Sequence, residues 1–337
     1  MKLERTLFCL LFLTTTLWLA TKVAGTSIEK PAASREFNFT YSISVPRLPQ
    51  NSRDLRIWIP VATSNPHQSV KLLRMSGTVP LRIARESEYG DCMAYAEVQR
   101  PSFTAAHFTL AYHVTRRKYS VGSFRQLMGQ DNHHTPITPS LKRFVQPDRL
   151  VPIDGEIRQV ADKATAGRRG EIFKAHAIYD YVFHHMRYDK SGTGWGHGNA
   201  IWACDAKHGN CTDFHSLFIG MMRAVGIPAR FVIGFPLPPG KSEGTIPGYH
   251  CWAEFYVAGK GWVPVDISEA WLNHSKYGFF FGSVDSNRVR FSAGRDITLV
   301  PRQSGPPLNY FVYPHVELNG KTYTGFRAHF KFSNASS

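Results

Sequence analysis

The sequence predicts an α+β protein in which an all-β sandwich domain precedes a domain of mixed helices and strands. Two periodicities support this prediction. Over residues 34–118, apolar and polar residues alternate, as they do in strands that bury one face. Near residues 155–165 and 171–187, and again over 211–225, apolar residues recur every three or four positions, which is typical of amphipathic helices. The chain has 337 residues, enough for two domains, and 43% of them are hydrophobic, as in a packed globular protein.

Residues 1–25 have the pattern of a secretory signal peptide. Lys2 and Arg5 precede an apolar run at residues 7–20, and small residues follow, with Gly25 before the expected cleavage site. An uncleaved anchor is the alternative, but the run is short for a membrane-spanning helix and threonines interrupt it. No later segment is apolar enough to cross a membrane. We therefore expect an exported protein, periplasmic or extracellular, whose mature chain has no transmembrane segment.

Residues 34–118 are expected to form the all-β sandwich. The alternation is clearest in the segments 37–45 and 106–114, and prolines and glycines separate the predicted strands. Residues 119–150 contain three prolines and little periodicity, so we predict a connection between the two domains there.

Residues 151–300 are expected to form the second domain. Its predicted elements, in order, are helices near 155–165 and 171–187, a glycine-rich loop at 189–210, a helix from Cys211 to Gly226, and strands near 229–235, 249–257 and 262–267. Short strands, such as one at 295–300, are expected toward the C-terminus. Residues 301–337 are expected to supply strands that pack on the core of this domain.

Cys211 is the leading candidate for chemistry. It follows a Gly209–Asn210 break and begins an apolar helical repeat. A thiol in the first turn of a helix faces the positive end of the helix dipole, which favours the reactive thiolate. A buried structural cysteine is the alternative, because free cysteines are among the most buried residues. Downstream, His250 and Asp266 could supply a base and a group that orients the base.

Three blocks of sequence resemble the core of the transglutaminase-like superfamily, in its bacterial form, which has a papain-like fold. The blocks are Gly209–Phe214, Gly226–Arg230 and His250–Asp266, and the resemblance covers roughly residues 170–270. It implies a papain-like transglutaminase core preceded by the sandwich. By the same resemblance, Cys211 is the nucleophile, His250 the general base and acid, and Asp266 the residue that orients His250.

Asp266 can reach His250 only if both side chains lie on the same side of a strand pair. A three-residue loop at residues 258–260 would place Asp266 opposite Trp252 and diagonal to His250, roughly 7–8 Å away between backbones. A two-residue loop would place Asp266 on the other face. The alternative role for Asp266 is that of a turn or cap carboxylate.

The resemblance also implies that a tryptophan upstream of the nucleophile helps to stabilise the oxyanion. Trp195 and Trp202 are the two candidates, and packing is the alternative role for either. Paired histidines, such as His133–His134 and His184–His185, suggest a metal, but their spacing matches no zinc motif. We predict neither a metal nor a cofactor.

The cysteine count allows little cross-linking. With Cys211 as a working thiol, Cys92, Cys204 and Cys251 can form at most one disulfide among them. Cys251 is next to His250 on its strand, so its side chain is expected on the opposite face, packed in the core.

The net charge of +15 bears on the partners of the protein. A basic surface favours anionic surroundings, such as cell-envelope polymers, although a solvated basic surface without a partner is the simpler interpretation. Nucleic acid is not expected, because the cationic residues are scattered and no recognition motif is present.

Together these features predict an exported thiol enzyme that acts on amide or peptide bonds of a protein or peptide substrate. Cys211 would form a thioester that is released by water, as in a protease or amidase, or by an amine, as in transamidation. Hydrolysis is favoured because the glycine-rich loop and residues 236–248 suggest an open, mobile rim. One alternative is a non-catalytic binding or assembly module with the same fold. Another is a cell-wall peptidase of the small papain-like type, whose Asp-Cys-Ser-Gly motif is absent here.

Overall fold

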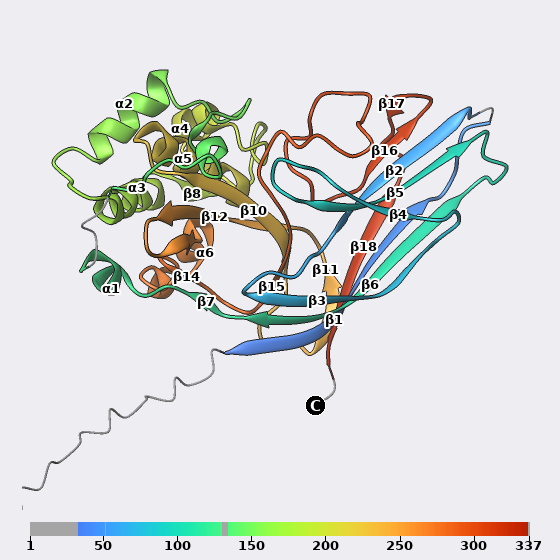
Figure 1. The fold of residues 1–337 in the computed structure, drawn as a ribbon, viewed down its shortest axis with the longest axis horizontal. Helices are drawn as coiled ribbons and strands as arrows, with labels where there is room; N and C mark the ends of the chain where they lie inside the picture. Colours follow the sequence, from blue (N-terminus) through green and yellow to red (C-terminus); the bar gives the residue numbers. More distant parts are fainter. Residues whose placement is uncertain (1–32, 51, 130–133, 336–337) are drawn as a thin grey trace, which may run out of the picture. The chain divides into compact units, whose positions relative to one another are not determined.

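The structure is a computed structural model that describes residues 33–50, 52–129 and 134–335. The expected signal peptide at residues 1–25 lies outside the described residues, as does His133. The described chain mixes helices with several sheets, and the predicted α+β class is confirmed (Figure 1).

Two five-stranded antiparallel sheets form the sandwich. The strands of the first sheet, in spatial order, are β11 (Glu243–Ile246), β18 (Arg327–Asn334), β1 (Ser34–Val45), β6 (Ala106–Arg117) and β3 (Gln68–Gly77). Those of the second are β17 (Lys321–Thr322), β16 (His315–Leu318), β2 (Asp54–Val61), β5 (Cys92–Gln99) and β4 (Arg82–Arg85). In β1 the alternating residues Phe37, Phe39 and Tyr41 are fully buried, as their periodicity predicts.

The C-terminal strands complete the sandwich. β18 pairs with β1 over eight residue pairs, and β16 pairs with β2. Residues 301–337 also contact the core of the second domain, since the ring of Phe330 on β18 lies 4.2 Å from that of Phe235 on β10, but their strands belong to the sandwich sheets. This sheet pairing was not expected, because a local hydrophobic pattern identifies a strand without specifying a partner that lies nearly the whole chain away.

A four-stranded antiparallel sheet forms the centre of the second region. Its strands, in spatial order, are β13 (Gly261–Val265), β12 (His250–Val257), β10 (Ala229–Pro236) and β15 (Arg288–Ala293). The helices are α1 (Phe124–Met128), α2 (Gly155–Ala164), α3 (Glu171–His185), α4 (Ala200–Ala206), α5 (Cys211–Ala224) and α6 (Ile267–Leu272), with 3-10 turns η1 (Lys142–Val145) and η2 (His274–Lys276). Two further strand pairs are β8 (Arg187–Tyr188) with β9 (His208–Gly209), and β7 (Tyr119–Ser120) with β14 (Ser283–Val284). In Figure 1 the helices gather at the left of the view and the sandwich strands at the right.

The long helices and the central strands lie where the periodicity places them, but two local predictions are wrong. The expected loop at residues 189–210 contains the short helix α4, whose N-cap Asn199 accepts hydrogen bonds from the backbone N–H groups of Ile201 and Trp202. The expected strand at residues 295–300 is not formed. Gly294 and Asp296 both have positive φ there, which breaks an extended chain.

Helix α5 is enclosed by the rest of the structure. All of its residues are buried, and it packs against β12, β10 and the helices α2, α3, α4 and α6. Its last turn holds Arg223, whose guanidinium forms a fully buried ion pair with Asp148 at 2.6 Å.

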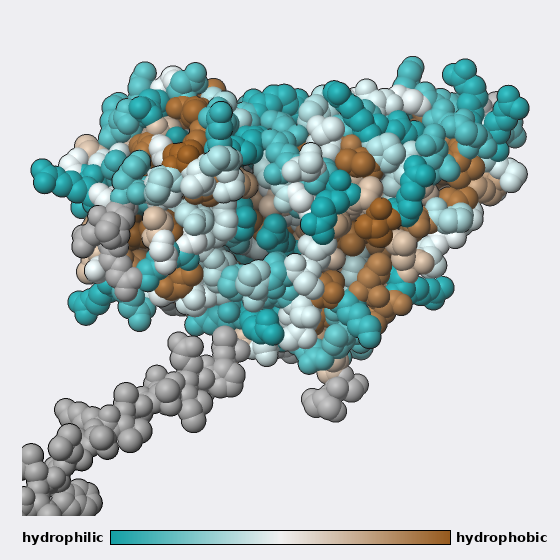
Figure 2. Space-filling model, in the orientation of Figure 1, coloured by the Kyte–Doolittle hydropathy of each residue, from teal (hydrophilic) through white to brown (hydrophobic). Residues whose placement is uncertain are grey.

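A polar surface covers most of the face in Figure 2, with apolar residues in separate groups. Among the described residues, no helix combines the length and the hydropathy that crossing a bilayer requires.

Candidate active site

Cys211 is the first residue of α5, as the sequence predicts. Asn210 caps the helix by accepting a hydrogen bond from the N–H of Thr212 at 2.8 Å, and Asp213 reaches back to accept from the N–H of Asn210 at 2.9 Å. This capping box fixes the helix start, so the Cys211 thiol is held at the positive end of the helix dipole. The thiol is 3% exposed.

The β12–β13 hairpin has the register that the three-residue loop requires. Val257 pairs with Gly261 and Ala253 with Val265, which places Asp266 opposite Trp252, as predicted. Asp266 follows β13 directly and is the N-cap of α6, where its Oδ1 accepts from the N–H of Glu269 at 3.1 Å. The sequence left two alternative roles for Asp266, that of a cap carboxylate and that of a partner of His250. In the structure Asp266 caps α6 and also lies next to His250.

His250 connects the thiol to the carboxylate. Its Nε2 lies 2.7 Å from Oδ2 of Asp266, and its side chain also hydrogen-bonds to Cys211. The structure therefore brings Cys211, His250 and Asp266 together in the order thiol, imidazole, carboxylate. All three are buried, with His250 only 7% exposed and Asp266 fully enclosed.

This arrangement favours an ion pair between the thiol and the imidazole. The pKa of Cys211 lies well below its ordinary value, because hydrogen bonds from Cys251 and His250 and the charge of His250 outweigh burial. Burial alone would lower the pKa of His250, but the negative charge and hydrogen bond of Asp266 raise it well above its ordinary value. Thiolate and imidazolium together are the reactive state of a cysteine–histidine pair.

Arg288 is a partner of this site that the sequence analysis missed. Its Nη1 donates to Oδ2 of Asp266 at 2.7 Å, the same oxygen that faces His250. Burial would raise the pKa of Asp266, but the charges of His250 and Arg288 hold it far below its ordinary value. Arg288 begins β15, a strand that the sequence pattern did not indicate, so no local signal connected it with Asp266.

Cys251 and His215 form a second layer behind the nucleophile. The Cys251 sulfur lies 3.7 Å from Nδ1 of His215 and 3.8 Å from Oγ1 of Thr212, and it also hydrogen-bonds to Cys211. Nε2 of His215 accepts from the N–H of Ile267 at 3.1 Å, and burial lowers the pKa of His215 to about 4, so this imidazole is neutral near pH 7. Cys251 is buried on the α5 side of its strand, but it contacts the candidate nucleophile rather than apolar core alone.

The glycine-rich loop before α5 is held in place. The backbone N–H groups of Gly196 and Gly198 donate to the two carboxylate oxygens of Asp213, at 2.7 and 2.9 Å. The buried Arg295 donates to the backbone oxygens of His197 and Gly198 from the other side. These bonds anchor the backbone of residues 196–198, the part of the expected rim where buried charged groups contact it.

The second expected rim segment, residues 236–248, is also anchored. Within it, β11 pairs with β18, and the guanidinium of Arg35 donates to the backbone oxygens of Pro238 and Lys241. The side chains of β11 from Glu243 to Thr245 are exposed. Residues 236–248 thus expose side chains of β11 to solvent, while their backbone is hydrogen-bonded to the sandwich.

The two oxyanion candidates precede α5, one in the glycine-rich loop and one on α4. Trp195 is half-buried in the loop, and Trp202 lies on α4, where its ring packs edge-to-face against His208. Within the described chain, neither indole N–H donates a hydrogen bond to another residue. Their role in the reaction remains a prediction.

The four cysteines Cys92, Cys204, Cys211 and Cys251 are free thiols. Across the described ranges, no group of three or more His, Cys, Asp and Glu side chains is arranged to hold a metal ion.

Comparison with known proteins agrees with this fold. Residues 158–267 match the family model of the transglutaminase-like superfamily, so the chain carries a transglutaminase-like core at these residues. A crystal structure from Cytophaga hutchinsonii, described as a candidate cysteine protease, is similar over 91% of this chain and 93% of that one, with a TM-score of 0.59 and 17% identity. That likeness extends to the sandwich and concerns the fold.

Two curated proteins are related in sequence. An uncharacterized protein of Haemophilus influenzae is 26% identical over 329 residues, covering 86% of this chain and 87% of the relative. The uncharacterized protein YebA of Bacillus subtilis is 29% identical over 82 residues, which are 22% of this chain and 11% of YebA.

Proposed function

We propose that the protein is a cysteine-dependent acyl-transfer enzyme that acts on amide or peptide bonds. The observation that carries this proposal is the position of His250, which hydrogen-bonds to Cys211 on one side and to Asp266 on the other. A thiolate, an imidazolium and a buried carboxylate in this order are the parts that nucleophilic catalysis by cysteine requires.

The reaction then proceeds in two halves. The Cys211 thiolate attacks the carbonyl carbon of the substrate amide, and the C–N bond breaks as the His250 imidazolium gives its proton to the leaving nitrogen. The products of this half are an amine and a Cys211 thioester. In the second half, neutral His250 takes a proton from water, the resulting hydroxide attacks the thioester, and the carboxylic acid leaves with the thiolate restored.

Asp266 acts on His250 throughout. Its carboxylate stabilises the imidazolium and fixes the orientation of the ring, while Arg288 and the first turn of α6 hold the carboxylate itself. The oxyanion would be stabilised by the backbone N–H of Cys211, at the start of α5, and by the indole of Trp195 or Trp202.

Water is the proposed acceptor, which makes the enzyme a protease or amidase. Residues 190–193 of the loop before α5 and the side chains of Glu243 and Thr245 on β11 are exposed to solvent. Amine transfer needs a second approach to the thioester from which water is kept out. Because both rim segments are anchored, the support for hydrolysis rests on exposure rather than on mobility.

A partition experiment tests the choice of acceptor. Casein is incubated with the enzyme in the presence of an excess of a dansylated primary amine, and new carboxyl termini are quantified against dansyl incorporation. We expect mostly cleavage, and predominant incorporation would establish transamidation instead. Cys211→Ala is the control, and any activity that it retains would come from a different site.

A non-catalytic binding or assembly module is the remaining alternative. This alternative predicts that the Cys211 thiol has ordinary reactivity, whereas the enzyme hypothesis predicts a reactive thiolate. Thiol labelling distinguishes the two hypotheses and does not require a known substrate. The export of the protein through residues 1–25, a catalytic domain at 151–300 and attraction to anionic cell-envelope polymers all remain part of the proposal. Their support is the sequence pattern and the charge of +15.

A further inference from the structure

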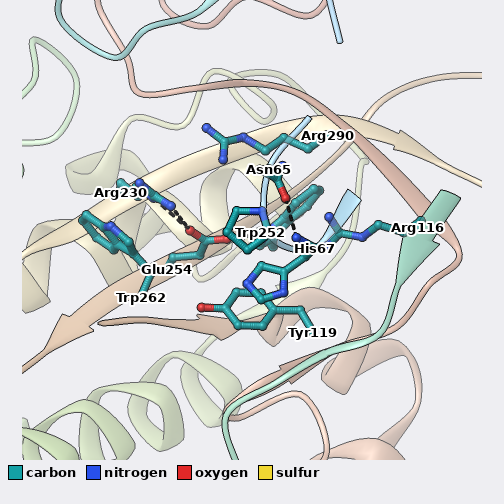
Figure 3. Close-up of a pocket in the computed structure, with 10 residues that line it drawn as sticks. Asn65, His67, Arg116, Tyr119, Arg230, Trp252, Glu254, Trp262 and Arg290 are labelled. Carbon is teal, nitrogen blue, oxygen red and sulfur yellow. Dashed lines mark hydrogen bonds and ion pairs between the residues drawn. The ribbon is translucent and has the colours of Figure 1, made fainter. Parts of the chain in front are cut away.

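A small cavity lies between the sandwich and the central sheet, apart from the candidate active site (Figure 3). Its free volume is about 220 Å³, and neither Cys211, His250 nor Asp266 lines it. The sandwich side contributes Asn65, Pro66, His67, Arg116 and Tyr119, and the central sheet contributes Arg230, Trp252, Glu254, Trp262 and Arg290.

Positively charged side chains outnumber negatively charged ones among the residues that line this cavity. Three guanidiniums, those of Arg116, Arg230 and Arg290, face one carboxylate, that of Glu254. Arg230 already occupies this carboxylate, with Nε and Nη2 at 2.8 and 2.6 Å from Oε2, as the dashed lines in Figure 3 show. His67 adds no charge near pH 7, because burial and the neighbouring Arg116 lower its pKa to about 4. Arg116 and Arg290 therefore have no ion-pair partner among the lining residues, although the charge of the buried Asp91, which does not line the cavity, acts on Arg290.

Arg116 is the most isolated of these groups. It is 2% exposed, and its Nε is buried without a hydrogen-bond partner. Its guanidinium lies 5.9 Å from the centre of the Trp252 ring, and burial together with the charge of Arg288 lowers its pKa to about 9. Within the described ranges, the Arg290 side chain likewise has no hydrogen bond or ion pair. Buried charges in proteins are normally paired, because the cost of removing an isolated charge from water is several kcal/mol.

From this geometry we infer that the cavity is a binding site for a small tetrahedral oxyanion of charge −2, such as a phosphate group, held between Arg116 and Arg290. Two guanidiniums without an ion pair favour binding of such an anion, and guanidinium forks match its oxygens in geometry. The volume is below the range of about 300–1,000 Å³ that drug-sized ligands fill, so the site suits a small anion. Free phosphate and the phosphate of a small monoester share this chemistry.

The cavity is also connected to the candidate active site through one side chain. Trp252 forms a wall of the cavity, and its ring lies 5.1 Å from the guanidinium of Arg288, which donates to Asp266. Arg116 and Arg288 therefore both contact Trp252, one from the cavity and one from the site. The inference concerns binding of the anion and does not depend on the proposed enzymatic activity.

Calorimetric titration of the whole mature chain with inorganic phosphate at neutral pH tests the site. Phosphate should bind with one-to-one stoichiometry and should raise the thermal unfolding midpoint, whereas sodium chloride at equal ionic strength should do neither. Sulfate should bind comparably, because it has the same shape and charge. A phosphate monoester that binds more tightly than phosphate identifies a monoester site, and a monoester that fails to bind identifies free phosphate as the ligand.

Three variants localise the binding. Arg290→Gln should weaken phosphate binding about tenfold or more, because one charge-assisted contact is lost. Arg168→Gln, at an exposed arginine with the same charge change, should leave binding unchanged. Arg116→Met should raise the unfolding midpoint in the absence of phosphate, because it removes an unpaired buried charge. If Arg116→Met does not fold, phosphate binding by Arg290→Gln still tests whether the cavity is the binding site. Absence of one-to-one binding, or equal binding by wild type and Arg290→Gln, would overturn the inference.

Discussion

At the scale of single residues, Asp266 combines two roles in one carboxylate. One oxygen accepts from His250 and Arg288, and the other caps α6. A carboxylate fixed from both ends has little freedom to turn, so the imidazole that it contacts is fixed as well. The cap also means that the start of α6 and the position of His250 depend on the same side chain.

The reactivity of Cys211 should show the effect of this arrangement. At pH 6, iodoacetamide should label Cys211 well before Cys92, Cys204 or Cys251, because its pKa lies well below the ordinary value. Labelling should decline only as the pH falls through this lowered pKa. His250→Ala should move the rise of labelling to higher pH, because it removes the positive charge that stabilises the thiolate. Peptide mapping after partial labelling measures this, and equal labelling of the four cysteines would falsify the nucleophile assignment.

Asp266→Asn tests the charge of this carboxylate while keeping the cap. Asparagine is as good an N-cap as aspartate, so α6 should keep its start, but the buried Arg288 loses its ion pair and the unfolding midpoint should fall. The amide cannot stabilise the imidazolium, so turnover should fall roughly 10²–10⁴-fold. The labelling curve of Cys211 should shift to higher pH in the same variant. Unchanged turnover with unchanged labelling would remove Asp266 from the proposed machinery.

At the scale of elements, the start of α5 is the organising feature of the site. The Asp213 carboxylate accepts from three backbone N–H groups, those of Asn210, Gly196 and Gly198. One side chain thereby joins the helix start to the loop that precedes it. The loop also needs glycine at position 198, because its φ is +61° and a Cβ atom would lie 2.5 Å from the Ser216 hydroxyl.

Asp213 should therefore contribute strongly to stability. Asp213→Asn keeps only one accepting oxygen and should lower the free energy of unfolding by about 1–3 kcal/mol, and Asp213→Ala should lower it further. Asp162→Asn, at an exposed i,i+4 ion pair on α2, is the matched control and should change it by less than about 1 kcal/mol. Urea unfolding measures all three. Similar losses for Asp213→Asn and Asp162→Asn would show that the loop does not depend on this carboxylate.

At the scale of the whole described chain, the sandwich and the central sheet share one hydrophobic core. Phe39 of the sandwich lies 5.4 Å from Phe235 of β10, measured between ring centres, and Phe330 lies 4.2 Å from the same ring. The core cluster runs without a break from β1 through α5 to β18. Buried aromatic contacts of this kind couple the two regions energetically.

We expect the two regions to unfold in one transition. Cys92 of the sandwich and Cys204 of α4 are both buried, so pulsed thiol labelling in increasing urea reports each region separately. The two midpoints should coincide, and Phe330→Ala should lower both together by about 3–5 kcal/mol. Lys331→Ala, on the exposed face of the same strand, is the control. Midpoints that separate would mean that residues 34–118 and 151–300 are independent domains, as the sequence pattern alone suggested.

Much of the candidate site was determined by the sequence itself. The helix start at Cys211, the hairpin register and the position of Asp266 opposite Trp252 follow from capping residues, periodicity and a three-residue loop, which are local properties. The order of Cys211, His250 and Asp266, together with the resemblance, identified the three side chains that the structure brings into contact.

Only the tertiary structure decided which distant segments meet. It brought Arg288 to Asp266, Cys251 and His215 to the nucleophile, Arg295 to the glycine-rich loop, and β18 to β1. It also enclosed Arg116 and Arg290 around one cavity. The physical reason is that capping and periodicity act over a few residues, whereas ion pairs, sheet partners and cavities depend on how the chain packs as a whole.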